Sequence, residues 1–224
     1  MKSLLSKLLI VLLLLSITLS CFAGCDTDGE GSGEGGGQGT GEGEGPGEFI
    51  DYASEVKLNR NSGRANAEVT VKTFVDGDTT HFNVPKTVAS SGVLKARYLG
   101  INTPESTGQI EPWGKKASDY TKSKLSAATS IVIESDTATW NPDSTGERFL
   151  VWVWYKTAEM TDYRCLNMEI LQSGLARSSK SSDTVYSSEC TAMLNQAVNH
   201  KLYVFSTEKD PDFYYGDAIP MTLN

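Results

Sequence analysis

The stretch Leu94-Lys95-Ala96-Arg97-Tyr98-Leu99-Gly100-Ile101-Asn102-Thr103-Pro104-Glu105 runs from a predicted strand into a polar turn. Leu94 and Tyr98 share one face of an extended chain, whereas the two cationic residues between them share the other, which is the pattern of a half-buried strand. Pro104 lacks a backbone N–H and ends the strand ladder. The guanidinium of Arg97, the amide of Asn102 and the carboxylate of Glu105 are therefore expected close together at the end of one strand.

A second polar turn lies upstream, in Thr73-Phe74-Val75-Asp76-Gly77-Asp78-Thr79-Thr80. The Asp76-Gly77 pair between apolar and β-branched residues is a strong hairpin signal. Asp78 follows directly, so its carboxylate emerges just past the turn and is free to face another strand end. We expect this hairpin to bring an acidic group to the polar turn described above.

These two segments together resemble the staphylococcal nuclease family. Three further motifs follow in the family's order and at compatible spacings: Gly114-Lys115-Lys116-Ala117-Ser118-Asp119-Tyr120-Thr121, Gly146-Glu147-Arg148-Phe149-Leu150 and Gly174-Leu175-Ala176. The resemblance spans about Glu68 to Ser206. It implies an α+β fold built on a five-stranded OB-fold β-barrel with about three helices.

The hydrophobic pattern is compatible with this arrangement. Strands are predicted at about Glu68–Val75, Thr79–Val84, Val93–Ile101, Ser130–Ser135 and Arg148–Tyr155, and helices at about Pro112–Ala127, Leu166–Ser173 and Ser187–His200. The segment from Phe149 to Tyr155 is apolar at both parities, so both faces of that strand must be covered. A hairpin, a third strand, a helix and two further strands suit an OB-type barrel.

The candidate chemistry is that of carboxylates, arginines and oxygen ligands, because the two isolated histidines suggest neither a zinc site nor a histidine base. Phosphodiester cleavage needs an aimed water, a group that activates it, and positive charge near the oxygens that gain electron density. The resemblance implies that Asp78, Asn102 and the Thr103 carbonyl bind Ca²⁺, that Glu105 activates the water, and that Arg97 and Arg148 clamp the phosphate.

Two positions depart from the family pattern. Asn102 stands where the family usually has a second metal carboxylate, so the site loses a formal negative charge and we expect a higher Ca²⁺ requirement. Glu147 stands where the family usually has glycine before Arg148, and its carboxylate either pairs with that arginine or faces water. Further along the barrel, Glu134 and Asp136 are interpreted as rim charges.

The N-terminus has the layout of a signal peptide, with two lysines before an apolar run and small residues after it. Phe22-Ala23-Gly24-Cys25 resembles a bacterial lipoprotein box, although Phe22 replaces the more usual leucine. Residues 1–24 are therefore predicted to be the signal peptide, and Cys25 the lipidated residue that anchors the protein to the membrane. An uncleaved helix and plain secretion after a different cut are the alternatives.

Residues 25–56 are predicted to hold the lipidation site and a Gly- and Glu-rich flexible linker. No apolar residue occurs among the 23 residues from Asp26 to Glu48, so this segment does not bury enough surface to fold. As a flexible coil it would span about 25 Å. The remaining residues, 57–224, are predicted to form one nuclease-like domain.

The formal net charge is −8, and most of it lies near the N-terminus. Residues 1–57 hold 3 Lys and Arg against 9 Asp and Glu, which leaves 17 against 19, or −2, for the rest of the chain. This balance neither supports nor excludes a polyanionic substrate. Binding depends instead on whether cations converge on one site.

Cys165 and Cys190 are the two cysteines of the predicted domain. In an oxidising location a disulfide between them would close a loop of about 25 residues and contribute about 3 kcal/mol. Two separate buried thiols are the alternative. The sequence does not decide between them.

The sequence therefore predicts an exported hydrolase of phosphodiester bonds, either anchored at the cell surface or secreted. By resemblance it is a Ca²⁺-dependent nuclease that cuts single-stranded or frayed DNA and RNA and leaves 3′-phosphate ends, and no protein partner is implied. The alternative is a catalytically weak OB-fold module that binds single-stranded nucleic acid. Glu105 and both arginines favour the enzyme, whereas Asn102 favours the binding module.

Overall fold

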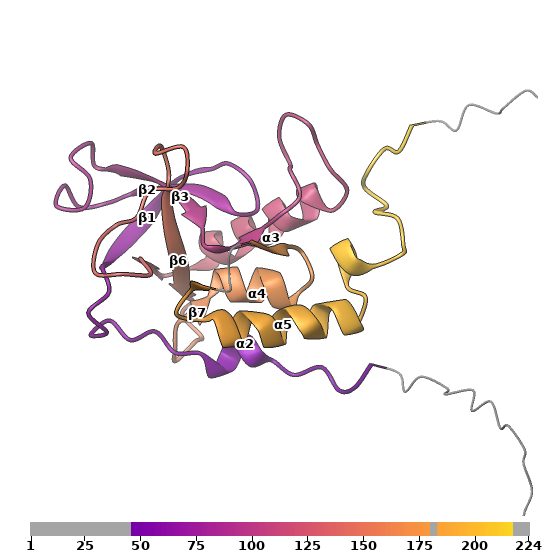
Figure 1. Ribbon diagram of the computed structural model, residues 1–224. Coiled ribbons are helices and arrows are strands. Elements are labelled where there is room, and N and C mark those ends of the chain that lie inside the picture. The colour runs from indigo at the N-terminus through magenta and orange to yellow at the C-terminus, as the bar shows by residue number, and fades with distance from the viewer. Residues whose placement is uncertain (1–45, 180–182, 217–224) are drawn as a thin grey trace, which may run out of the picture. The chain divides into compact units, whose positions relative to one another are not determined.

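Five strands form a closed barrel, as the sequence predicts (Figure 1). They are β1 (Asn66–Phe74), β2 (Thr79–Asn83), β3 (Val93–Tyr98), β5 (Ser130–Glu134) and β6 (Phe149–Lys156). All except β3 begin and end within two residues of their predicted bounds. The predicted α+β OB-fold class is confirmed.

The computed structural model describes residues 46–179 and 183–216. The predicted signal peptide, the proposed lipidation site Cys25 and most of the predicted linker lie outside this part. Within it, no helix has both the length and the apolar character needed to cross a membrane. The prediction of a membrane anchor thus rests on the sequence alone.

The barrel closes through a parallel pair. Its strands follow the order β3-β2-β1-β5-β6 with antiparallel neighbours, and β3 then pairs with β6 in parallel, with Arg97 opposite Leu150. β6 is buried from Val151 to Tyr155, and α4 (Leu166–Gln172) packs on it. The prediction that both faces of this strand are covered is confirmed.

A bend at the end of β3 changes the direction of the chain before the polar turn that contains Asn102 and Thr103. Gly100 has a φ of 82°, a conformation that glycine adopts without steric cost. The chain therefore leaves the barrel after Tyr98 and continues as β4 (Gly100–Asn102), which pairs with β8 (Arg177–Ser179). The sequence predicts one continuous strand here because the alternation of side chains does not reveal the bend.

The described residues contain four helices: α2 (Tyr52–Glu55), α3 (Gly114–Ala127), α4, and α5 (Ser187–Asn199). Figure 1 shows α4 between α3 and α5, in agreement with their contacts. α3 begins later than predicted, because Trp113 has a left-handed φ of 69° and Pro112 precedes the helix. Four small elements were not predicted: α2, the strands β7 (Arg164–Cys165) and β8 (Arg177–Ser179), and the 3₁₀ helix η2 (Tyr203–Phe205).

Packing begins before Lys57, where the predicted domain starts. The Gln196 side-chain amide accepts from the Ile50 N–H and donates to the Ile50 carbonyl, both at 2.8 Å. The Ala53 N–H donates to Gln172 Oε1 at 3.0 Å, and Ala53 is fully buried. Two buried glutamines therefore hold the end of the predicted linker against α4 and α5.

Glu134 is fully buried, so its interpretation as a rim charge is wrong. Its carboxylate accepts hydrogen bonds from Arg64 Nε at 2.9 Å and from Trp154 Nε1 and the Tyr186 hydroxyl at 3.1 Å. Such partners are what a buried carboxylate requires. Glu134 therefore joins the chain before β1, the barrel and the start of α5.

Cys165 and Cys190 are free thiols, and both are buried. Burial raises the pKa of each thiol, to about 12 for Cys190. Of the two alternatives that the sequence leaves open, the structure shows the separate thiols.

Candidate active site

Asp78 lies fully buried at the turn between β1 and β2. Its Oδ2 accepts from the Thr103 N–H at 2.9 Å, its Oδ1 accepts from Thr79 Oγ1 at 3.1 Å, and its own N–H donates to Asp76 Oδ1 at 3.1 Å. Burial is the largest influence on this carboxyl and raises its pKa to about 7, although Arg97 and the Thr103 amide act in the opposite direction. Asp78 is thus fixed in place by the polar turn it was predicted to face.

Arg97 joins Asp78 to Asn102. Its Nη1 donates to Asp78 Oδ1, and its Nη2 donates to Asn102 Oδ1. The antiparallel pairing of β2 with β3 places Arg97 opposite Thr79, beside the hairpin turn. The bend at Gly100 then brings Asn102 back toward the same guanidinium. Arg97 therefore bonds Asp78 and Asn102, and Thr103 bonds Asp78, so four of the predicted site residues are linked.

The hairpin turn also packs tightly against its surroundings. A Cβ on Gly77 would lie 2.8 Å from Thr103 Oγ1 and 2.9 Å from the Ala117 Cβ in α3. The Gly77 carbonyl accepts from the buried Thr121 hydroxyl at 2.6 Å. Only glycine allows this approach of the turn to Thr103 and α3.

Arg148 lines the same pocket as Arg97, a space of about 190 Å³ between β3, β4 and the start of β6. Its Nε donates to Asp143 Oδ2 at 2.7 Å. Burial raises the pKa of Asp143, but the Thr145 hydroxyl and Arg148 outweigh this effect and lower it to about 2. Glu147, which the sequence offered as a partner of Arg148, instead lies 3.7 Å from Lys95 Nζ.

Glu105 lies exposed on the loop that leaves Thr103. Its backbone is fixed at both ends, because its N–H donates to Glu111 Oε2 at 3.0 Å and its carbonyl accepts from the Glu111 N–H at 2.9 Å. Its carboxylate is solvent-accessible, as a group that takes a proton from water must be.

The predicted metal ligands fit a hard cation. Asp78 and Asn102 present oxygens to one positive group, the Arg97 guanidinium. Together with the Thr103 carbonyl, which the sequence predicts as the third ligand, they would give Ca²⁺ the all-oxygen donor set that it prefers. No three acidic, histidine or cysteine side chains gather as a metal-binding group among the described residues.

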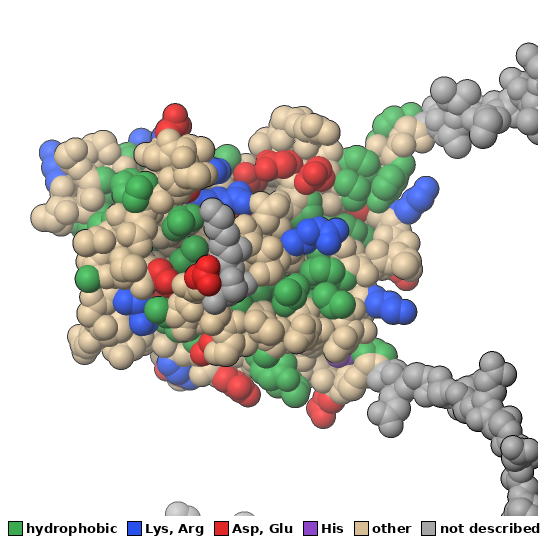
Figure 2. Space-filling model, viewed as in Figure 1, with side chains coloured by type: hydrophobic (Ala, Val, Ile, Leu, Met, Phe, Trp, Pro, Cys, Tyr) green, Lys and Arg blue, Asp and Glu red, His purple; other side chains and the backbone are tan. Residues whose placement is uncertain are grey.

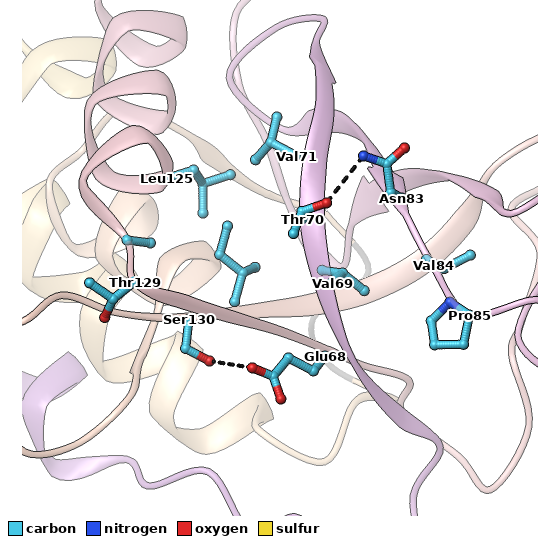
Figure 3. Close-up of a pocket in the computed structure, with 12 residues that line it drawn as sticks. Glu68, Val69, Thr70, Val71, Asn83, Val84, Pro85, Leu125, Thr129 and Ser130 are labelled. Carbon is cyan, nitrogen blue, oxygen red and sulfur yellow. Dashed lines mark hydrogen bonds between the residues drawn. The ribbon is translucent and has the colours of Figure 1, made fainter.

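Acidic and basic side chains both occur on the face shown in Figure 2. A separate recess of about 410 Å³ lies between β1, β2, β5 and the end of α3, where Ser130 donates to Glu68 and Asn83 donates to Thr70 (Figure 3). None of the six predicted site residues lines this recess.

Asp143 and Thr121 are two residues at the site that the sequence analysis missed. A weak signal for Asp143 exists, since Asp143-Ser144-Thr145 suits an Asx turn, and the Thr145 N–H does donate to Asp143 Oδ1 at 3.1 Å. Thr121 falls on the buried stripe of α3 and gives no sign of its contact with Gly77.

The closed barrel with its flanking helices defines an OB-fold protein. A family model described as staphylococcal nuclease homologue matches residues 95–206, which is half of the chain, and the chain therefore belongs to this family. The matched domain is a nuclease-like, nucleic-acid-binding module, and the family is generally calcium-dependent. A search of curated proteins found no match. Asp78 precedes the matched residues, yet it contacts Arg97 and Thr103 within them.

Proposed function

We propose that this protein is an exported, Ca²⁺-dependent phosphodiesterase that hydrolyses DNA and RNA. The observation that carries the proposal is the contact between Arg97, Asp78, Asn102 and Thr103, with Arg148 on the same pocket. This site combines a buried carboxylate, oxygen ligands and two arginines. Membership of the staphylococcal nuclease family supports assigning phosphodiester chemistry to it.

Each residue has a defined task in this proposal. Asp78, Asn102 and the Thr103 carbonyl hold Ca²⁺, which supplies positive charge beside the scissile phosphate when bound. Arg97 and Arg148 contact the phosphoryl oxygens, for which the planar guanidinium fork is well suited. Glu105 accepts a proton from the water that attacks phosphorus as the bond to the leaving oxygen breaks.

Both arginines are already paired with carboxylates of this chain, Arg97 with Asp78 and Arg148 with Asp143. Substrate and Ca²⁺ must therefore compete with these contacts. This competition weakens phosphate binding in either function. The feature that favours the second candidate, a module that binds single-stranded nucleic acid and cleaves it weakly, is therefore the amide of Asn102 in place of a metal carboxylate.

The deciding experiment incubates the full chain, purified in detergent, with denatured DNA and with RNA across a Ca²⁺ titration and in chelator. The proposal predicts Ca²⁺-dependent cleavage that falls at least about 100-fold in Glu105→Gln. Glu208→Gln, a change at an exposed position, is the matched control. Binding without cleavage at every Ca²⁺ concentration would establish the binding module instead.

We also propose that the protein is exported and held at the cell surface by lipid on Cys25, with the Gly-rich linker as a spacer. The support is the order of signal peptide, cysteine and flexible linker in the sequence. The wild type should incorporate labelled fatty acid, and Cys25→Ser should not. A membrane-bound wild type that incorporates no fatty acid would indicate an uncleaved helix instead.

A further inference from the structure

The C-terminal segment, residues 207–216, follows the residues that the family model matches and packs against the start of α3. Asp210 is its buried residue, with 5% of its surface exposed. Asp210 Oδ2 accepts from the Trp113 N–H at 2.5 Å, and Oδ1 accepts from the Asp212 N–H at 3.0 Å. The Asp210 N–H donates to the Tyr215 hydroxyl at 2.9 Å. The segment is therefore anchored on α3 through one carboxylate.

Trp113 needs such an anchor, because a left-handed φ of 69° is unfavourable for a bulky residue. Its ring packs edge-on against Tyr203 at 5.2 Å, and its N–H is one of the free donors at a helix start. A carboxylate at that position satisfies the donor and interacts favourably with the helix dipole. Asp210 thus stabilises the strained entry into α3.

The same entry supports Glu105. A Cβ on Gly114, the first residue of α3, would lie 2.1 Å from the Glu105 carbonyl oxygen, so the helix start and Glu105 are in direct contact. The Gly114 N–H donates to the Glu111 carbonyl at 3.0 Å, and Glu111 in turn bonds both backbone groups of Glu105. Residues 105–114 therefore form a loop whose two ends contact each other. Asp210 holds the C-terminal end of this loop through its hydrogen bond with Trp113.

We infer that Asp210 is a positioning residue that fixes the loop carrying Glu105 for catalysis. The inference rests on the proposed function of Glu105 as the group that activates water. The hydrogen bonds of Asp210 go to Trp113, Asp212 and Tyr215, and none goes to a residue proposed to bind the metal or the phosphate. Its effect is transmitted through Trp113 and Gly114 to the Glu105 backbone, so its loss should lower the rate of the chemical step more than the affinity for substrate.

The test compares Asp210→Ala, Asp210→Asn and the control Asp212→Ala in the full chain. Asp212 lies in the same segment and is exposed. Its alanine variant removes one negative charge and leaves the hydrogen bond between Asp210 and Trp113 in place. Asparagine retains one acceptor oxygen and should restore part of the function. The measurements are kcat and KM on denatured DNA at saturating Ca²⁺, thermal unfolding, and hydrogen exchange of residues 105–114.

Asp210→Ala should lower kcat by about 10- to 100-fold with little change in KM. Exchange in residues 105–114 should accelerate while the barrel strands remain protected, Asp210→Asn should be intermediate, and Asp212→Ala should match the wild type. An unchanged kcat, or exchange that accelerates equally throughout the chain, would overturn the inference.

A different result would contradict the proposed function itself. If the wild type shows no cleavage that depends on Glu105, the nuclease assignment fails and the catalytic role of Asp210 fails with it. Exchange in residues 105–114 would then still show whether Asp210 holds the loop, because that measurement needs no activity.

Discussion

At the scale of single residues, the site is defined by what Arg97 contacts. Its guanidinium spans Asp78 and Asn102, one a carboxylate and the other an amide. Because residue 102 is an amide, the carboxylate of Asp78 is the negative group that both Arg97 and the proposed cation contact. The charge at this position should therefore control the Ca²⁺ requirement.

Asn102→Asp should lower the Ca²⁺ concentration for half-maximal cleavage by about tenfold, because a carboxylate adds a formal charge to the donor set. Asn102→Ala, which removes the ligand oxygen, should raise it. The measurement is a Ca²⁺ titration of cleavage for the three proteins. If aspartate left both the midpoint and the maximal rate unchanged, residue 102 would not be a metal ligand.

The ion pair between Asp143 and Arg148 should make stability depend on pH. Thr145 and Arg148 lower the pKa of Asp143 to about 2 against the effect of burial, whereas an unfolded aspartate titrates near about 3.9. Its stabilising contribution is therefore fully present above about pH 4 and is lost as the pH falls toward about 2. Urea unfolding of wild type and Asp143→Asn should differ at neutral pH and converge in acid. A difference that stays constant over this range would contradict the assignment.

At the scale of elements, the turn between β1 and β2 is coupled to α3. Gly77→Ala should destabilise the protein by about 1–3 kcal/mol, because the added Cβ overlaps Thr103 and Ala117. It should also raise the Ca²⁺ requirement, since Thr103 is a proposed ligand. Gly47→Ala is the control, because a Cβ there meets nothing within 4 Å. Equal unfolding midpoints for both variants would show that the turn has room to relax.

The sequence predicts elements well where a regular pattern determines them. The alternation in β3 and the apolar run in β6 led to the correct strands, and the Asp76-Gly77 pair led to the correct hairpin. The bend at Gly100 was missed because a single glycine fits either a strand or a turn. Asn167 was missed for a different reason: its side chain bonds Leu99, Val151 and Val153 where β3 leaves β6, and such long-range polar contacts have no local signal.

In the candidate site, too, the sequence reveals residues that lie in motifs and misses residues that act through contacts between loops. Asp78, Arg97, Asn102 and Thr103 were identified by motif, and the structure places them in contact. Asp143 and Asp210 were not identified, since their partners lie 5 and 97 residues away and depend on how loops close. Sequence thus identified the residues proposed to do the chemistry, whereas the residues that hold them in place required the fold.

At the scale of the whole molecule, charge is nearly balanced after residue 57, where 17 Lys and Arg face 19 Asp and Glu. Arg97, Arg148 and Lys95 each lie within ion-pair distance of an acidic side chain. Acidic and basic groups both occur on the face in Figure 2. Non-specific attraction to a polyanion should therefore be weak, and substrate contact should depend on the two arginines of the pocket.

This balance predicts a shallow salt dependence of nucleic-acid binding. Each phosphate neutralised on a single strand contributes about −0.7 to the slope of log K against log salt, so the one phosphate that both arginines contact should give about −0.7. The measurement is the affinity of Glu105→Gln for a fluorescent single-stranded oligonucleotide with Ca²⁺ present, across a range of NaCl concentrations. In the same assay Arg148→Gln should lower the affinity without making the slope steeper, because Arg97 still contacts the same phosphate. A slope of about −3 or steeper would mean that four or more phosphates are neutralised, and would require a basic surface beyond this pocket.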